Sequence, residues 1–358
     1  MKRIWEIVAV CLPLMLAGCD DTIHEYPEPQ NSLIIIEPYV NRDAPNYYKT
    51  VVYDDNWNCT VTELPEVPAY QFLADKRVEV RIIADVYRGK AESRSSAENL
   101  VERRVIKVEH NALPPQDTIH FHLPDGDYHI LAWADYVVDN PEYQGPFLAD
   151  TLTAVRSRLD RYPRNPFFRS SASGTETFTI DFKNSQDGYP ITRADGTKLR
   201  TIPIALNRPV ARYRIVALDY DAFLQSGGNI EDVTVKVIYK QYVSVGFNVA
   251  TDVPNAFIST YSFNVKPADI VYEGRYENSL FTDYVFTSEQ TETNVIVDLY
   301  FYDGEGKEIN HCQDIKIPLM RDHETVVRGN FLTLPLGEGE GVSIDDNFEG
   351  EYVVDLDF

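Results

Sequence analysis

The sequence has few cysteines, few positive charges and few long apolar runs. It holds four cysteines, two of them within the first nineteen residues, so only Cys59 and Cys312 remain for the folded part. Neither lies in a CxxC pair, which argues against a structural zinc centre. No apolar run after residue 16 is long enough to cross a bilayer as a helix. With 33 Lys and Arg against 56 Asp and Glu, the net charge of −23 argues against nucleic-acid binding.

The sequence also lacks the short motifs of familiar enzyme classes. No GxSxG, HExxH, P-loop or Rossmann pattern is present, and no repeat of about 20–50 residues is evident. We therefore expect a protein that is not an enzyme and that holds no cofactor. Asp303-Gly304-Glu305-Gly306 and Asp345-Asp346-Asn347 offer calcium-type ligands without the EF-hand spacing. Asp and Gly in such places more often shape the backbone of a turn.

The first nineteen residues follow the pattern of a bacterial lipoprotein signal. Met1-Lys2-Arg3 is basic, Val8–Leu16 is a short apolar run, and Leu16-Ala17-Gly18-Cys19 resembles the lipobox. The pattern predicts a signal peptide over 1–18, lipid on Cys19 and a lipidated tether over 19–32. The alternative is an ordinary secretory signal in which the cysteine is incidental.

Strand-like runs separated by Gly, Pro, Asn and Asp fill the rest of the chain. Thr234–Tyr239 and Asn294–Tyr302 alternate with the period of two expected for half-buried strands. Helical pattern is scarce, and only Asp219–Gln225 and Ser95–Glu102 could be short helices. Spaced strands with turn signals predict an all-β protein built of antiparallel β-sandwiches. The other predicted strands are Leu33–Val40, Arg77–Tyr87, Glu102–Val108, Thr177–Phe182, Ala211–Leu218, Ser259–Val265 and Asp314–Pro318.

The length favours two domains, with a boundary near Leu206–Pro209. Residues 181–199 read as loop, and a new alternating strand starts at Val210. We predict an N-terminal domain over 33–206 and a C-terminal domain over 207–358. Cys59 and Cys312 could pair as a disulfide in an oxidising envelope, or remain two free thiols.

One segment, Thr118–Tyr136, concentrates histidines. An Asp-Gly pair between two β-rich runs predicts a hairpin centred on residues 125 and 126. In that register one face is apolar, and the other carries His122 opposite His129, with His120 on the diagonal. The three imidazoles could converge on zinc. The preferred interpretation is an ordinary sheet face with no metal, because no supporting second shell is visible.

Three motifs, in order, resemble fimbrillin-like surface lipoproteins of the Bacteroidales. They are Leu123–Tyr128 with Ile130–Tyr136, then Arg208–Tyr213, then Thr325–Thr333. Together with the lipobox, the resemblance implies two transthyretin-like antiparallel β-sandwich domains in tandem. It also implies an outer-membrane lipid anchor, exposure at the cell surface, and a non-enzymatic place in a pilus or adhesive structure.

Two function classes compete at this point. The first is a fimbrial subunit or anchor that acts in adhesion. The second is a glycan-binding surface lipoprotein that works with an outer-membrane nutrient transporter. Four aromatic residues could line a sugar-stacking surface, but strand aromatics are more often packed in a core. They are Trp57, Tyr239, Tyr242 and Phe247.

Two further segments bear on assembly. The resemblance implies that Arg42, just after the apolar strand Leu33–Val40, could be a proteolytic processing site; the alternative is a plain loop arginine. The closing segment Glu351–Phe358 is an amphipathic strand that could complete its own domain or be donated to a neighbouring subunit. Its apolar face is formed by Tyr352, Val354, Leu356 and Phe358.

Overall fold

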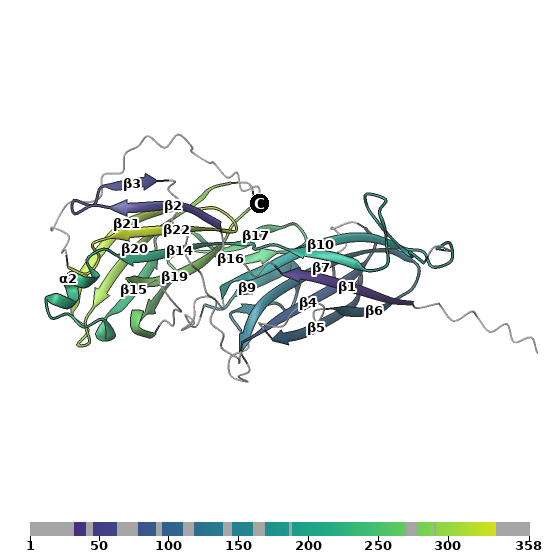
Figure 1. The fold of residues 1–358 in the computed structure, drawn as a ribbon, viewed down its shortest axis with the longest axis horizontal. Coiled ribbons are helices and arrows are strands. Elements are labelled where there is room, and N and C mark those ends of the chain that lie inside the picture. The colour runs from purple at the N-terminus through teal and green to yellow at the C-terminus, as the bar shows by residue number, and fades with distance from the viewer. Residues whose placement is uncertain are drawn as a thin grey trace, which may run out of the picture.

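The computed structural model describes residues 32–40, 46–62, 78–90, 95–109, 118–138, 145–159, 169–185, 188–269, 278–289 and 291–333. The predicted all-β fold is confirmed, since almost all regular structure in these ranges is strand. Two lobes lie side by side, with a small sheet between them (Figure 1).

The first lobe packs a three-stranded sheet, in the order β13-β1-β6, on a six-stranded sheet, in the order β12-β11-β10-β7-β4-β5. Its core draws apolar side chains from both sheets, as a sandwich requires. The strands are β1 (Ser32–Val40), β4 (Val78–Arg88), β5 (Leu100–Glu109), β6 (Ile119–Leu123), β7 (Gly126–Val138), β10 (Ser171–Ile180), β11 (Ile191–Arg193), β12 (Lys198–Leu199) and β13 (Ile202–Leu206).

The second lobe packs a five-stranded sheet, in the order β19-β14-β22-β2-β3, on a four-stranded sheet, in the order β18-β15-β20-β21. The apolar side chains of both sheets again share one core. The strands are β2 (Asn46–Tyr53), β3 (Cys59–Thr62), β14 (Val210–Ala217), β15 (Thr234–Tyr239), β18 (Ser262–Val265), β19 (Ser279–Phe286), β20 (Thr293–Tyr302), β21 (Glu308–Leu319) and β22 (His323–Gly329).

A small sheet in the order β17-β16-β9-β8 lies between the lobes (Figure 1). An apolar cluster there joins side chains of β4 and β7 to side chains of β14, β16 and β19, so the lobes share a packed junction. The strands are β8 (Phe147–Leu148), β9 (Val155–Ser157), β16 (Val243–Asn248) and β17 (Val253–Ile258). The short helices are η2 (Leu152–Ala154), α2 (Tyr220–Gln225), η4 (Ile230–Asp232) and η5 (Pro267–Asp269).

The chain crosses between the lobes near its start. β1 lies in the first lobe, whereas β2 pairs in parallel with β22 of the second lobe, and β3 pairs with β2. Val51 and Tyr53 of β2 are buried in the second-lobe core. Residues 46–62 therefore lie with the second lobe, although the sequence placed them in the range 33–206. Parallel pairs also depart from the antiparallel expectation, because pairing across such long connections can run in either direction.

The predicted hairpin at residues 125 and 126 is wrong. β6 pairs with β1 in the smaller first-lobe sheet, whereas β7 pairs with β4 and β10 in the larger one. The turn thus joins the two sheets of the sandwich. The predicted apolar face is nevertheless correct: Phe121, Leu123, Tyr128 and Ile130 are all 0% exposed. They meet across the core instead of side by side.

The two short-helix predictions had opposite outcomes. α2 matches Asp219–Gln225, but the chain at Ser95–Glu102 forms a turn and then enters β5. β5 is an edge strand with a largely exposed, charge-rich surface. Charged side chains are common on edge strands because they discourage pairing with other chains. In the sequence such charged residues resemble those of a polar helix, which explains the wrong helix prediction.

Candidate functional site

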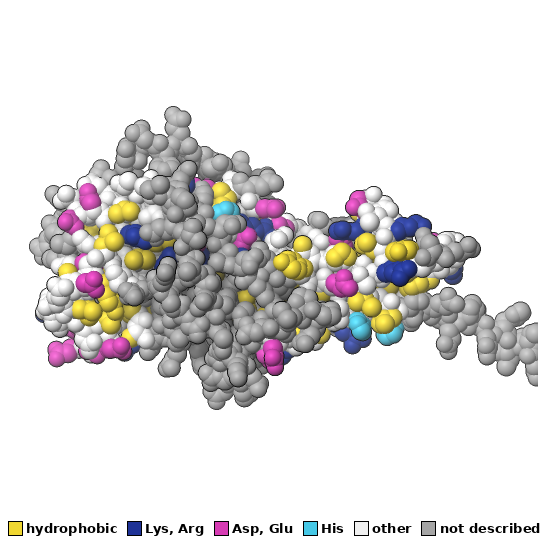
Figure 2. Space-filling view, viewed as in Figure 1, with side chains coloured by type: hydrophobic (Ala, Val, Ile, Leu, Met, Phe, Trp, Pro, Cys, Tyr) yellow, Lys and Arg dark blue, Asp and Glu magenta, His cyan; other side chains and the backbone are white. Residues whose placement is uncertain are grey.

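The structure does not bring the three candidate histidines together. His120 and His122 lie on the exposed face of β6, beside Ile35 and Leu33 of β1. His129 lies in β7 and is only 2% exposed. Histidine side chains accordingly appear at the surface of the first lobe, next to apolar ones (Figure 2). Within the described ranges, no three His, Cys, Asp or Glu side chains gather as metal ligands.

His129 is fixed in place by contacts on three sides. Its Nδ1 donates to the carbonyl oxygen of Gly89 at 2.8 Å, which leaves Nε2 to bond the Ser95 hydroxyl at 2.7 Å. The ring stacks on Tyr87, with centroids 5.0 Å apart and an interplanar angle of 13°. A side chain with both nitrogens and one face engaged has a structural role.

We expect His129→Ala to lower the free energy of unfolding by about 2–3 kcal/mol, because it leaves a cavity and removes two partly buried hydrogen bonds. His122→Ala is the matched control from the same segment. Its side chain is exposed, so we expect a change of no more than about 0.5 kcal/mol. Urea unfolding of both variants measures the difference, and equal losses would contradict the placement of His129.

Both candidate disulfide cysteines are free thiols in the structure, Cys59 exposed on β3 and Cys312 buried in β21. Tyr53 lies directly opposite Cys59 in the β2–β3 ladder, and its hydroxyl accepts from the Lys316 amide at 3.1 Å. Partial desolvation raises the pKa of the Cys59 thiol, and burial raises the pKa of Cys312 well above its usual value. Thiols of raised pKa are weak nucleophiles at neutral pH. Their pairing stays a prediction.

β1, which follows the predicted tether in the sequence, is an integral strand of the first lobe. Its first half pairs antiparallel with β6 and its second half pairs in parallel with β13, and Ile36 takes part in both ladders. Ile34 and Ile36 are 0% exposed, whereas Leu33 and Tyr39 on the opposite face are exposed. β1 therefore fills a slot between two strands. Cys19, Arg42 and the closing strand Tyr352–Phe358 lie outside the described residues.

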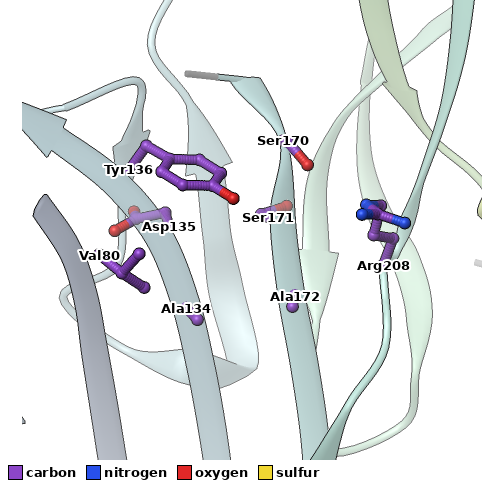
Figure 3. Close-up of a pocket in the computed structure, with 8 residues that line it drawn as sticks. All are labelled: Val80, Ala134, Asp135, Tyr136, Ser170, Ser171, Ala172 and Arg208. Carbon is purple, nitrogen blue, oxygen red and sulfur yellow. The ribbon is translucent and has the colours of Figure 1, made fainter. Parts of the chain in front are cut away.

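A small polar hollow lies at the junction of the lobes (Figure 3). Its volume of about 10 Å³ suits about one water molecule. Asp135 at its edge accepts from Arg81 Nε at 2.8 Å and from Trp133 Nε1 at 3.2 Å, and burial raises the pKa of its carboxyl despite Arg81. Because Asp135 is engaged by Arg81 and Trp133 and there is room for little more than one water molecule, the hollow serves packing. It is lined by Val80, Ala134, Asp135, Tyr136, Ser170, Ser171, Ala172 and Arg208.

Two larger hollows lie at the far end of the second lobe, on either side of the β20–β21 turn. One of about 420 Å³ opens over β15 and β18, and one of about 520 Å³ opens toward the loop after α2. The Asp303 side chain stabilises the backbone of this turn, because its Oδ1 accepts from the amides of Glu305 at 3.0 Å and Lys307 at 2.9 Å. Asp232, Asp303 and Gly304 line both hollows.

Sequence reasoning missed these hollows, because it read the turn only as a weak calcium motif. The aromatic residues weighed for sugar stacking lie elsewhere. Trp57, Tyr239 and Phe247 are buried in cores, which confirms the packing interpretation for these three, whereas Tyr242 is 74% exposed. No local sequence signal marks the hollow over Thr234, because its longer neighbour Tyr302 lies beside it only through the β15–β20 pairing.

Comparisons with known proteins give a family and a set of distant structures. Residues 56–357 match the model of a family of unknown function, DUF6562. No curated protein matches the chain. Among the described residues, none of the helices has the length and apolar character needed to span a bilayer.

Several solved structures resemble the chain at low identity. A candidate adhesin from Bacteroides ovatus is 13% identical, with 81% of this chain and 92% of that chain covered and a TM-score of 0.37. A candidate cell adhesion protein from Parabacteroides distasonis is 10% identical, with coverages of 86% and 91% and a TM-score of 0.39. The tip fimbrial protein Mfa3 from Porphyromonas gingivalis, truncated at its C-terminus, is 11% identical, with coverages of 80% and 81% and a TM-score of 0.30.

Proposed function

The chain belongs to DUF6562, a family of unknown function, and we propose that it is a lipid-anchored adhesive protein of the bacterial cell surface, acting as a fimbrial subunit or anchor. The placement of β1 carries the proposal. Residues 20–31 alone separate the predicted lipid site, Cys19, from a strand that is embedded in the first-lobe sandwich. A lipid at Cys19 would therefore hold the folded body directly at the outer membrane.

The three motifs that resemble fimbrillin-like proteins support the proposal by where they lie. Leu123–Tyr136 supplies β7, the strand between β4 and β10. Arg208–Tyr213 leads into β14, and Thr325–Thr333 covers most of β22 and the residues after it. β14 and β22 are parallel neighbours. Each motif thus corresponds to an interior strand of its sheet.

Assembly with other subunits would occur by strand addition. β1 lies in a slot whose two sides are the ladders of β6 and β13, and a chain break after Arg42 would separate β1 from the rest of the protein. N-terminal sequencing of the protein from native cells tests this step. A lipidated start at Cys19 indicates an anchor, and a start at Asp43 indicates a polymerising subunit. Co-purification with an outer-membrane transporter in place of filaments would contradict the fimbrial role.

We expect Cys19→Ala to move the protein from the membrane to the soluble fraction or to block its processing. A lipid-modified cysteine carries several acyl chains, whereas a single chain binds membranes only marginally. Cell fractionation with mass spectrometry of the mature N-terminus measures this. Cys59→Ala is the control and should leave the protein in the membrane. A mature protein that starts elsewhere and carries no lipid would overturn the anchor.

A further inference from the structure

The outer face of the β18-β15-β20 sheet carries a side-chain arrangement that the proposed function does not use. Alternation in β15 directs Val235 and Val237 into the core, at 0% exposure, and directs Thr234 and Lys236 outward. Directly across the ladders, Lys236 faces Asn264 of β18, and Thr234 faces Tyr302 of β20. The outer face is therefore polar and partly aromatic.

The hollow of about 420 Å³ exists because Thr234 is short. Its neighbours Lys266 and Tyr302 are long, so a depression forms over the threonine. The β20–β21 turn closes one end, where a Cβ on Gly304 would come within 3.2 Å of Asp232 Cβ. Glycine at this position lets the turn pack closely against η4. Thr234 lies at the base of this hollow, Lys266 and Tyr302 lie at its sides, and the β20–β21 turn closes one end. We call this hollow of about 420 Å³ the pit.

Two lysines, Lys236 and Lys266, line this pit together with two aspartates, Asp232 and Asp303. Acidic side chains outnumber basic ones across the protein, and several stand out on the rim of the second lobe (Figure 2). Several other lysines are paired with carboxylates, as in Lys49–Glu292 at 2.7 Å and Lys240–Asp314 at 2.5 Å. In the described part of the chain, Lys236 and Lys266 have no ion-pair partner, although both line the pit.

Acceptors and donors for hydroxyl groups surround the same pit. Asp232 offers a carboxylate, one oxygen of which accepts from Asn229 Nδ2 at 2.7 Å, and Asn264 offers a side-chain amide. The Tyr302 ring adds a flat apolar surface with a polar tip. The combination suits a pyranose, which presents an apolar C–H face and a rim of hydroxyls. Lys236 and Lys266 add two ammonium groups that can each donate to a negatively charged substituent, beside the carboxylates of Asp232 and Asp303.

We propose that this pit binds an acidic saccharide, a pyranose that carries a carboxylate or sulfate group held between Lys236 and Lys266, with its ring against Tyr302. The inference rests on the proposed role as a surface adhesin and names the class of ligand. The hollow of about 520 Å³ across the turn gives room for a neighbouring sugar unit. The pit lies in the lobe with α2, away from β1 (Figure 1).

The test uses the intact lipoprotein, purified in mild detergent, on an array of sialylated, uronate-containing, sulfated and neutral glycans. We expect binding to acidic glycans and weak or no binding to the neutral parents. Thr234→Tyr fills the pit without removing a charge, and the double variant Lys236→Ala/Lys266→Ala removes the charges without filling it. Each should weaken binding by about tenfold or more. Lys183→Ala, which changes an exposed lysine of the first lobe outside both hollows, is the control and should bind as the parent does.

Three results would overturn the inference: no binding to any acidic glycan, equal binding to neutral glycans, or full binding by Thr234→Tyr. Circular dichroism of each variant checks that the fold is kept, and Thr234→Ala, which cannot fill the pit, should retain binding. Adhesion of cells that lack the protein is measured in parallel. Loss of adhesion with no glycan binding leaves the proposed function standing, whereas unchanged adhesion removes the proposed function itself.

Discussion

Arg169→Ala should lower the free energy of unfolding by about 3–5 kcal/mol, because it leaves Asp283 buried without its cation. Arg169 NH1 contacts Asp283 Oδ1, and the two side chains are 7% and 1% exposed. The Tyr239 hydroxyl donates to Asp283 Oδ2 at 2.8 Å, and the Tyr284 amide donates to Oδ1 at 2.8 Å. Arg169 comes just before β10 of the first lobe, and Asp283 lies on β19 of the second. The pair therefore joins the lobes, and chemical denaturation of the variant measures its loss.

The loss of unfolding free energy caused by Arg169→Ala should be larger at high pH than at low pH. Burial raises the pKa of Asp283 above its ordinary value of 3.8, even with Arg169 beside it. The folded state thus holds this proton more tightly than the unfolded chain, so the contribution of Asp283 to stability is complete below pH 3.8 and is lost as the pH rises through the folded pKa. Without Arg169 the folded pKa rises further. The difference between variant and parent should be smaller near pH 4 than near pH 7.

Two companion variants separate charge burial from general disruption. Asp283→Asn in the Arg169→Ala background removes the orphaned charge and should recover part of the loss. Arg193→Ala breaks the pair with Glu176, in which the arginine side chain is 34% exposed, and should cost no more than about 1 kcal/mol. Similar losses for Arg169→Ala and Arg193→Ala would show that the buried pair does not join the lobes energetically.

Side-chain alternation explains why so much of the fold could be predicted from the sequence. In β15 the predicted and observed bounds coincide at Thr234–Tyr239, because a strand with one buried face alternates strictly. β14 is a harder case. It lies between β19 and β22 and buries Arg212 and Arg214, both of which are paired with Glu324. These arginines are buried because they pair with a glutamate that is distant in the sequence, so the local sequence pattern makes them look like surface residues.

Pairing between distant segments could not be predicted in the same way. The same alternation buries Phe121 and Tyr128 whether β6 and β7 lie side by side or face each other across the core. The arrangement of β6 and β7 depends instead on their pairing with distant strands. β7 pairs with β4 on one edge and with β10 on the other, so no edge is left for β6. That choice also carries His129 inward, away from His120 and His122, and removes the metal site that a hairpin would have allowed.

The pit over Thr234 could not be predicted from the sequence for a related reason. Its residues come from β15, β18 and β20 and from the turn after β20. None is unusual in its local context, and a threonine between two valines reads as an ordinary exposed position. The site appears only when the ladders place Tyr302 beside Thr234 and Asn264 beside Lys236. Sites made by cross-strand neighbours depend on register, which local pattern does not fix.

Ile36→Asp should unfold the protein or cost on the order of 5 kcal/mol, because it buries an unpaired carboxylate at the centre of β1. Ile36 is 0% exposed and pairs with Ile119 of β6 and with Ile202 of β13, so the charge cannot be relieved on either side. Leu33→Asp is the matched control on the same strand. Leu33 is 47% exposed, and we expect a change within about 0.5 kcal/mol.

A milder variant keeps the prediction measurable if Ile36→Asp yields no folded protein. Ile36→Val removes one methyl group and should cost about 0.5–1.5 kcal/mol, whereas Leu33→Val should be close to neutral. Thermal unfolding of all four variants gives the comparison. If Ile36→Asp unfolds at the same temperature as the parent, β1 is not an integral strand of the first lobe. The direct connection between the predicted lipid and the folded body, on which the proposed function rests, would then be lost as well.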